Sequence, residues 1–207
     1  MKNSIKNIIF DLGGVILNID YKLTQDAFVK LGLKNIDDVY GQYFQVKFFD
    51  LFDRGEISED EFIDLSKDLF PENISKQQLV DAWNAMLLDM PEHRFDFLKK
   101  IGKKYRIFLM SNTNITHYDE YQKYIKDKYK INGLDDLFEK AYYSFLVGMR
   151  KPEDRFFNLI LEENNLKANE TLFIDDTSIN TDAAKTLGLQ ALWLKDNMDI
   201  TEALSEL

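Results

Sequence analysis

A single carboxylate interrupts an apolar run near the start of the sequence. In NIIFDLGGVI, Asp11 follows apolar residues and is itself closely followed by Gly13 and Gly14. Burying a lone carboxylate among apolar side chains is unfavourable unless it is hydrogen-bonded, paired with a cation or bound to a metal. The two glycines would let the backbone turn sharply and approach a ligand closely. The pattern indicates a functional aspartate rather than a turn residue.

Three later segments also place polar side chains directly after an apolar run. They are FLMSNT with Ser111, Asn112 and Thr113, GMRKP with Arg150 and Lys151, and LFIDDTSIN with Asp175, Asp176 and Asn180. Taken singly, the first and third could be helix caps and the second a loop entering a helix. Their joint occurrence with Asp11 indicates one shared site.

Together these groups suit phosphoryl chemistry. Asp11, Asp175 and Asp176 form an oxygen-rich set of the kind that binds Mg²⁺, an ion that keeps waters and substrate phosphate among its ligands. Ser111, nearby backbone amides and the cationic Lys151 would hold the remaining phosphate oxygens and stabilise charge. Asp11 would then be free to attack phosphorus and form an aspartyl-phosphate.

The elements that would position these groups follow from the hydrophobic pattern. Short apolar runs predict five strands, at Asn7–Leu12, Arg106–Met110, Lys140–Ser144, Thr171–Ile174 and Leu189–Leu194. Helical patterns lie between them, at Pro91–Lys104, Glu153–Glu163 and Ile179–Leu187, the last followed by Gly188. This alternation predicts an α/β fold, a Rossmann-like parallel sheet with helices on both faces. Ligands bind beyond the carboxyl ends of the strands in such a sheet, where all the polar groups fall.

The segment 20–90 has no convincing strand. Helical patterns cover Leu23–Leu31, Ile36–Phe52, Glu59–Phe70 and Ser75–Leu88, and Ser58 with Glu61 predicts a capping box. The aromatic series Tyr40, Tyr43, Phe44, Phe48 and Phe52 is typical of a packed helix face rather than a ligand box. We therefore expect a core from residues 1–19 and 91–207, with an inserted all-helical cap at 20–90.

Composition narrows the class of protein. The chain has 207 residues, a formal net charge of −10 and no cysteine. That acidity argues against nucleic-acid and anionic-membrane binding, since both need a basic face. The absence of cysteine excludes a thiol nucleophile and a thiolate metal site. No signal peptide or membrane-spanning run is recognisable, so we expect a cytoplasmic protein. We also expect a monomer or weak homodimer. His93 and His117 lack metal-ligand spacing, and we expect both at the surface.

The motifs resemble, over essentially the whole chain, those of the haloacid dehalogenase superfamily, closest to bacterial sugar-phosphate phosphatases of the α-glucose-1-phosphate phosphatase type. The resemblance implies an Mg²⁺-dependent phosphatase acting on a small phosphorylated metabolite, a sugar phosphate above all. It assigns catalysis to Asp11 and Lys151, and metal binding to Asp11, the Gly13 carbonyl, Asp176 and, through water, Asp175. It assigns phosphate binding to Leu12, Ser111, Asn112 and Lys151. Asn180 stands where some relatives have a second acid.

One departure from the family pattern concerns the proton donor. Family phosphatases usually carry a second aspartate two residues after the nucleophile as general acid and base, where this chain has Gly13. A positioned acid–base contributes roughly 10²–10⁴-fold. We therefore expect turnover to depend steeply on leaving-group acidity. Sugar 1-phosphates, acyl phosphates and aryl phosphates should be favoured over sugar 6-phosphates and glycerol phosphate.

Two other functions remain open at this point. Haloacid dehalogenases also lack the second aspartate and need no metal, but Asp175 and Asp176 without a cation would repel Asp11. A non-catalytic or weakly active binding protein on the same scaffold is the other alternative. Mg²⁺-dependent release of phosphate from an aryl phosphate distinguishes all three.

Overall fold

A five-stranded parallel sheet forms the centre of the molecule. The computed structural model describes residues 5–34, 36, 39, 47–70, 74–195 and 198–206. The strands are β1 (Asn7–Phe10), β2 (Arg106–Ser111), β3 (Lys140–Tyr143), β4 (Thr171–Asp175) and β5 (Gln190–Trp193). Their order is β3-β2-β1-β4-β5, and all neighbours are parallel. The five predicted strands and the Rossmann-like architecture are confirmed, with ends shifted by one or two residues.

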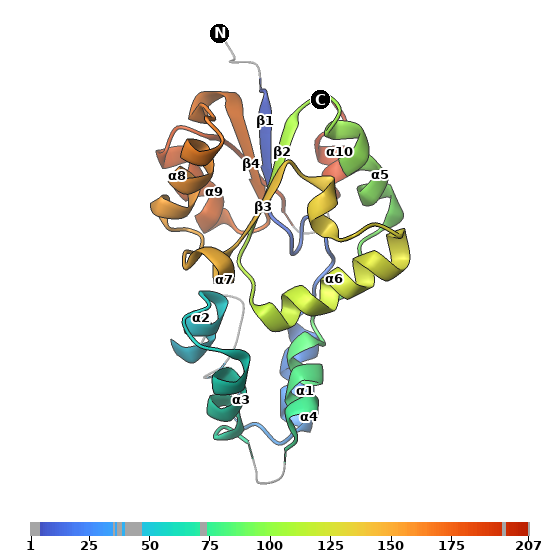
Figure 1. The fold of residues 1–207 in the computed structure, drawn as a ribbon, viewed down its shortest axis with the longest axis vertical. Coiled ribbons are helices and arrows are strands. Elements are labelled where there is room, and N and C mark those ends of the chain that lie inside the picture. Colours follow the sequence, from blue (N-terminus) through green and yellow to red (C-terminus); the bar gives the residue numbers. More distant parts are fainter. Residues whose placement is uncertain are drawn as a thin grey trace.

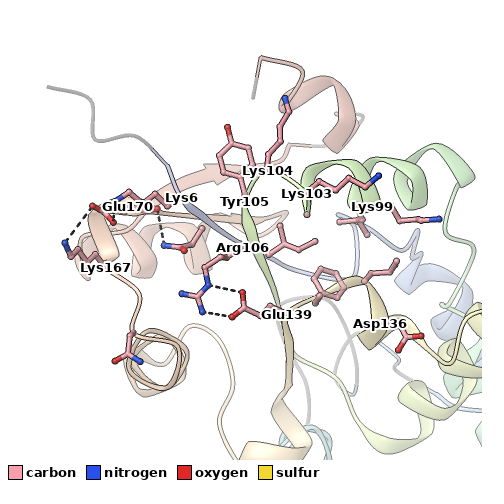
Figure 2. A pocket seen from close by; sticks show the side chains of 17 residues that line it. Lys6, Lys99, Lys103, Lys104, Tyr105, Arg106, Asp136, Glu139, Lys167 and Glu170 are labelled. Carbon is pink, nitrogen blue, oxygen red and sulfur yellow. Dashed lines mark hydrogen bonds and ion pairs between the residues drawn. The ribbon is translucent and has the colours of Figure 1, made fainter.

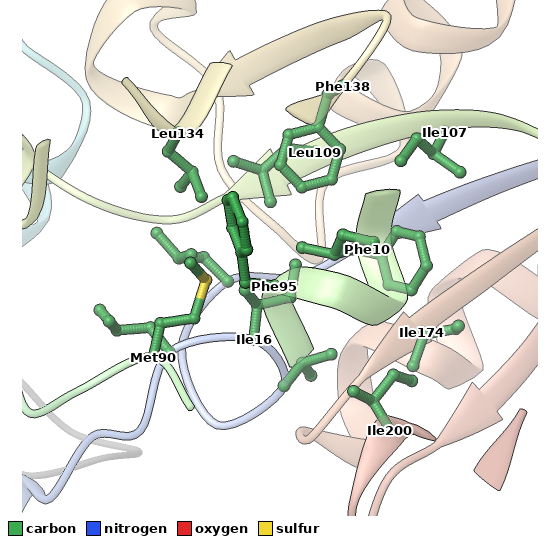
Figure 3. Close-up of a cluster of buried hydrophobic side chains, with 14 of the residues drawn as sticks. Phe10, Ile16, Met90, Phe95, Ile107, Leu109, Leu134, Phe138, Ile174 and Ile200 are labelled. Atoms are coloured by element: carbon green, nitrogen blue, oxygen red, sulfur yellow. The ribbon is translucent and has the colours of Figure 1, made fainter. Parts of the chain in front are cut away.

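Helices cover both faces of the sheet because β1 is apolar on both sides. Ile8 and Phe10 point to one face and Ile9 to the other. The first face packs on α5 (Glu92–Ile101), α6 (Ile115–Tyr129) and α10 (Ile200–Ala203), and Figure 3 shows part of this cluster. The second packs on α8 (Asp154–Glu163) and α9 (Ser178–Thr186). Figure 1 shows the two layers on opposite sides of the strands.

Four helices gather beyond the carboxyl edge of the sheet (Figure 1). They are α1 (Tyr21–Lys30), α2 (Lys47–Asp53), α3 (Glu59–Lys67) and α4 (Lys76–Asn84). We call them the helical unit. They share a core of their own, in which the rings of Phe52 and Phe62 stack at 4.1 Å and Trp83 lies beside Phe49. The predicted capping box is present at the start of α3.

Two chain segments, which run antiparallel to each other, join the helical unit to the sheet. Ile19 forms a bridge with Leu87, and the side chain of Asn18 donates a hydrogen bond to Asp89 at 2.9 Å. Of the predicted aromatic face, Phe52 is buried and Phe48 half-buried in the helical core, whereas Tyr40, Tyr43 and Phe44 lie outside the described residues.

Three helices were not predicted from the sequence. They are α6, the single turn α7 (Ser144–Val147) and α10. Two 3-10 turns, Leu134–Leu137 and Ala168–Glu170, were not predicted either. Among the described residues, none of the helices combines the length and the apolar character that crossing a membrane would need.

Candidate active site

The ends of three neighbouring strands bring the predicted residues together. Asp11 follows β1 directly, and its backbone N–H donates to the carbonyl of Ile174 at 2.9 Å, which continues the pairing with β4. Ser111 ends β2 and Asp175 ends β4. Because these strands flank β1 on either side, their carboxyl ends meet at one edge, the place where parallel sheets bind ligands.

Lys151 joins the two strand ends electrostatically. Its ammonium lies 2.5 Å from Oδ1 of Asp11 and 2.7 Å from Oδ2 of Asp175, and the residue is only 4% exposed. The neighbouring carboxylates hold the pKa of Lys151 above its usual value even though burial alone would lower it. Lys151 is therefore a fixed cation at the centre of the site. The other oxygen of Asp11, Oδ2, accepts no hydrogen bond from a described residue and is available to a ligand.

Asp175 is held on both of its oxygens. Oδ1 accepts from the backbone N–H of Thr177 at 2.8 Å, Oδ2 accepts from Lys151, and the amide of Asn180 donates to both at 3.0 and 3.1 Å. The residue is fully buried. A carboxylate so engaged is suited to orienting Lys151 and Asn180 rather than to moving, in keeping with an indirect role at a metal.

Asp176 lies against the glycine turn. Gly14 has φ +73°, and a Cβ built there would come 2.3 Å from Oδ2 of Asp176. Only glycine combines that left-handed backbone with room for the carboxylate. This explains the second glycine after Asp11.

Gly13 is constrained by space rather than by its backbone. A Cβ at this position would meet the Cδ1 atom of Ile19 at 2.9 Å. Leu12 and Gly13 both line the cavity in front of Asp11. At the position of the family's second aspartate, the turn therefore presents only backbone to the cavity.

Both polar atoms of the Asn112 side chain bond to the backbone of Lys151. Its Oδ1 accepts from the backbone N–H of Lys151 at 2.8 Å, and its Nδ2 donates to the Lys151 carbonyl at 3.0 Å. Both polar groups are thus used to fix the backbone that carries the cation. Phosphate contact from this residue would have to come from its main chain. Ser111 is buried at the end of β2 and lines the same cavity.

The donor set fits a divalent cation. One carboxylate oxygen from each of Asp11, Asp175 and Asp176 lies within 4.8 Å of the others. Burial, together with the charges of Asp175 and Asp176, raises the pKa of Asp11 to about 8, although Lys151 opposes the rise. The pKa of Asp176 is raised for the same reasons. When all three carboxylates are ionised, they leave two excess negative charges beside the one lysine, which Mg²⁺ with its preference for oxygen ligands would balance.

The cavity in front of Asp11 has a volume of about 630 Å³, and the helical unit supplies its far wall. The wall residues include Tyr21, Asp53, Trp83 and Met86, with His117 and Tyr121 from α6. His117 was predicted at the surface, and this is wrong. It lies in a helix, is 7% exposed and stacks on the Trp83 ring at 4.6 Å. His93, by contrast, is exposed and pairs with Asp199, as a surface residue does.

A larger hollow of about 840 Å³ lies at the opposite edge of the sheet (Figure 2). It is rich in lysine, but several of its charges are already paired. Arg106 pairs with Glu139 at 2.5 Å, and Lys6 pairs with Glu170 at 3.0 Å. This edge carries the amino ends of the strands and none of the motif residues. The chemistry of the chain is at the carboxyl edge.

Comparisons with known proteins agree with this geometry. The chain is 30% identical to a D-ribitol-5-phosphate phosphatase of Bacteroides thetaiotaomicron over 97% of both chains. It is 25% identical to a sesquiterpene phosphatase of Aspergillus oryzae over all of this chain and 98% of that one. An aspartate-to-alanine mutant of a Bacteroides thetaiotaomicron enzyme of this family, crystallised with magnesium and inorganic phosphate, superposes with a TM-score of 0.92 at 32% identity, covering 97% and 99% of the two chains. The sequence-family model of the haloacid dehalogenase-like hydrolases matches residues 8–194, and the chain belongs to that family.

Proposed function

We propose that the protein is an Mg²⁺-dependent phosphatase that hydrolyses a small phosphorylated metabolite, a sugar phosphate, through an aspartyl-phosphate on Asp11. The observation that carries the proposal is the buried arrangement in which Lys151 bridges Asp11 and Asp175 beside Asp176. Such a site offers a nucleophile, a cation and a metal-binding carboxylate set in one cavity. The named activities of the similar proteins support the same reaction class.

Each residue then has a defined task. Asp11 attacks phosphorus through a carboxylate oxygen, and the bond from phosphorus to the leaving oxygen breaks; a water later attacks the same phosphorus, which breaks its bond to Asp11 and restores the carboxylate. Lys151 and Ser111 hold the non-bridging phosphate oxygens. Asp11, Asp176 and the Gly13 carbonyl would bind Mg²⁺, with Asp175 acting through water. The bound ion would supply charge stabilisation on the phosphoryl oxygens.

We assign the helical unit, within residues 20–90, the role of a cap. Three observations support this: a separate hydrophobic core, a connection to the sheet through two bridged chain segments, and a position over the carboxyl edge. We also propose a monomer or weak homodimer. A cytoplasmic location stays a prediction.

Metal removal is the direct test of this function. In the presence of Mg²⁺ the protein should release phosphate from p-nitrophenyl phosphate, and chelation should lower the rate at least about 100-fold because charge stabilisation worth several kcal/mol is lost. Re-addition of Mg²⁺ should restore it. The measurement is the initial rate across a magnesium titration.

An Asp176→Asn variant provides the matched control. It should need a higher magnesium concentration for half-maximal rate, since it loses a proposed metal ligand. A rate that does not respond to chelation would contradict the metal role. Halide release from a 2-haloacid without magnesium would favour a dehalogenase, and the absence of both activities would favour a binding protein.

The missing general acid gives a second prediction. Gly13→Asp should speed hydrolysis of alkyl phosphates relative to p-nitrophenyl phosphate by up to about 100-fold, as a restored acid protonates the poorer leaving group. Because a Cβ at position 13 meets Ile19, the substitution should be made together with Ile19→Val, with Gly13→Ala plus Ile19→Val as its control. The measurement is kcat/KM for a series of leaving groups.

The parent protein itself can refute this account. D-ribitol 5-phosphate, named for the similar Bacteroides enzyme, is a primary alkyl phosphate and should be slow here on leaving-group grounds. If it is hydrolysed as fast as a sugar 1-phosphate, another group supplies the proton.

A further inference from the structure

The wall of the cavity opposite Asp11 contains a polar cluster that the proposed hydrolysis does not use. Asp53 at the end of α2, His117 in α6 and Arg150 line the cavity, and Asn114 at the N-cap of α6 lies behind them. Asn114 is fully buried and ties the cluster together. Its Nδ2 donates to Oδ1 of Asp53 at 3.0 Å, while its Oδ1 accepts from the backbone N–H of His117 at 3.1 Å and from Trp83 Nε1 at 3.3 Å.

Asp53 is buried with one oxygen left over. The residue is 7% exposed, and Asn114 satisfies Oδ1. The nearest cation to Oδ2 is Nη2 of Arg150 at 3.6 Å, beyond hydrogen-bond distance, and no described residue donates a hydrogen bond to it. Burial raises the pKa of Asp53, with Arg150 and Asn114 opposing. Since Asp53 lines the cavity, this oxygen is an acceptor available to a donor of a bound ligand.

His117 presents a second acceptor from the neighbouring helix. Its Nδ1 lies 2.8 Å from Oδ1 of Asn84, an oxygen that can only accept, so Nδ1 carries the hydrogen. Burial lowers the pKa of His117 to about 3, and the ring is therefore neutral near pH 7. Nε2 is left as an acceptor without a partner among the described residues. Stacking on Trp83 fixes the orientation of the ring.

We propose that Asp53 and His117 form a subsite that binds hydroxyl groups of the leaving group and selects polyhydroxylated phosphate esters over apolar ones. The inference rests on the proposed function for the placement of phosphate at Asp11. Hydroxyl groups carry the donors that both free acceptors need, and Arg150 can donate to a hydroxyl oxygen in return. An apolar leaving group, such as a terpenoid, would instead exclude water from Oδ2 of Asp53 and Nε2 of His117 and leave both without a hydrogen-bond donor.

The test compares two hydroxylated phosphate esters with one that has no hydroxyl groups. Affinities for D-glucose 1-phosphate, ribitol 5-phosphate and phenyl phosphate are measured by calorimetry with Mg²⁺ in the Asp11→Asn background, where turnover does not interfere. Adding Asp53→Asn should weaken the best-bound hydroxylated ester by about 10- to 100-fold more than phenyl phosphate, since a hydrogen bond to a charged group is lost. Adding His117→Phe, which keeps a ring against Trp83, should weaken it by roughly 10-fold more.

Asp64→Asn is the matched control, because it removes a carboxylate from the same helical unit at a position away from the cavity. Asp64 lies in α3 and pairs with Lys67 at 2.9 Å, and its side chain is 75% exposed. It is not among the described residues that line the cavity, so the ratio of the affinities should stay within about threefold of the parent. An equal loss of all ligands in Asp53→Asn, or the same shift of the ratio in Asp64→Asn, would overturn the subsite. If the selective binding holds but the parent hydrolyses no phosphate ester, the proposed function fails and the subsite stands.

Discussion

Replacing Asp11 with asparagine should lower turnover by about 10⁴-fold or more, because the variant keeps the shape of the side chain but has no carboxylate to attack phosphorus. The reaction has no substitute nucleophile at this position. Gly13 offers no side chain, and both oxygens of Asp175 are already engaged by Lys151, Thr177 and Asn180. The measurement is kcat for p-nitrophenyl phosphate with saturating Mg²⁺.

Two further readouts separate loss of the nucleophile from loss of the fold. After rapid quenching with an aryl phosphate, the peptide that contains Asp11 should gain the mass of one phosphoryl group in the parent and not in the variant. Circular dichroism should be the same for both proteins. A variant that retains turnover close to the parent's, or a phosphorylated peptide elsewhere in the chain, would contradict the assignment.

Asp11→Asn should also change the pH dependence of the free energy of unfolding. Without metal, the pKa of Asp11 is about 8 in the folded protein and near 3.8 when unfolded. A group with a raised folded pKa contributes its full stability below the unfolded value and loses it as pH rises through the folded value. Urea unfolding in the presence of a chelator should therefore show parent stability falling between about pH 4 and pH 8. Asp11→Asn should remove that part of the slope.

The strands and their ends were predictable because local patterns determine them. β1 alternates between two buried faces and reads as an apolar run, and the first carboxylate after it falls at the strand end. A parallel sheet then brings the ends of neighbouring strands together whatever the intervening segments do. Asp11, Ser111 and Asp175 could therefore be grouped from the sequence.

Residues that depend on contacts across the chain could not be read in this way. Helix α6 buries polar side chains such as Thr116, His117 and Gln122, so it lacks a clear apolar stripe. His117 is buried because Trp83 of the helical unit covers it, a contact between distant parts of the sequence. Asn112 gave no sign that its side chain would be used on the Lys151 backbone.

Asp53 does have a signal in the sequence. It follows Phe49 and Phe52 in a helix whose apolar side chains are buried, and its own position continues the buried stripe. A carboxylate on the buried side of an aromatic helix raises the same question that Asp11 raised in its apolar strand. What the sequence lacked was the partner, because Asn114 and Arg150 reach Asp53 only through the fold.

Replacing Lys151 with methionine should damage both activity and stability. The side chain is nearly fully buried between Asp11 and Asp175, and its loss leaves two buried carboxylates facing each other without a counter-charge. Breaking a buried ion pair from one side destabilises a protein by about 3–5 kcal/mol. Turnover should also fall by about 10²–10³-fold, since a preorganised cation no longer stabilises the transferring phosphoryl group.

Magnesium should rescue the stability of this variant but not its rate, and that divergence separates the two roles of Lys151. A divalent ion bound by Asp11 and Asp176 supplies the missing positive charge to the folded state, and at 100 times its dissociation constant it adds about 2.7 kcal/mol to the free energy of unfolding. The thermal midpoint of Lys151→Met should therefore rise with magnesium at least as much as the parent's. Lys151→Arg is the matched control, because it keeps the charge in the same buried slot. If Lys151→Met is as stable as the parent without metal, or if magnesium restores its rate, the lysine is not the structural and catalytic counter-charge of the site.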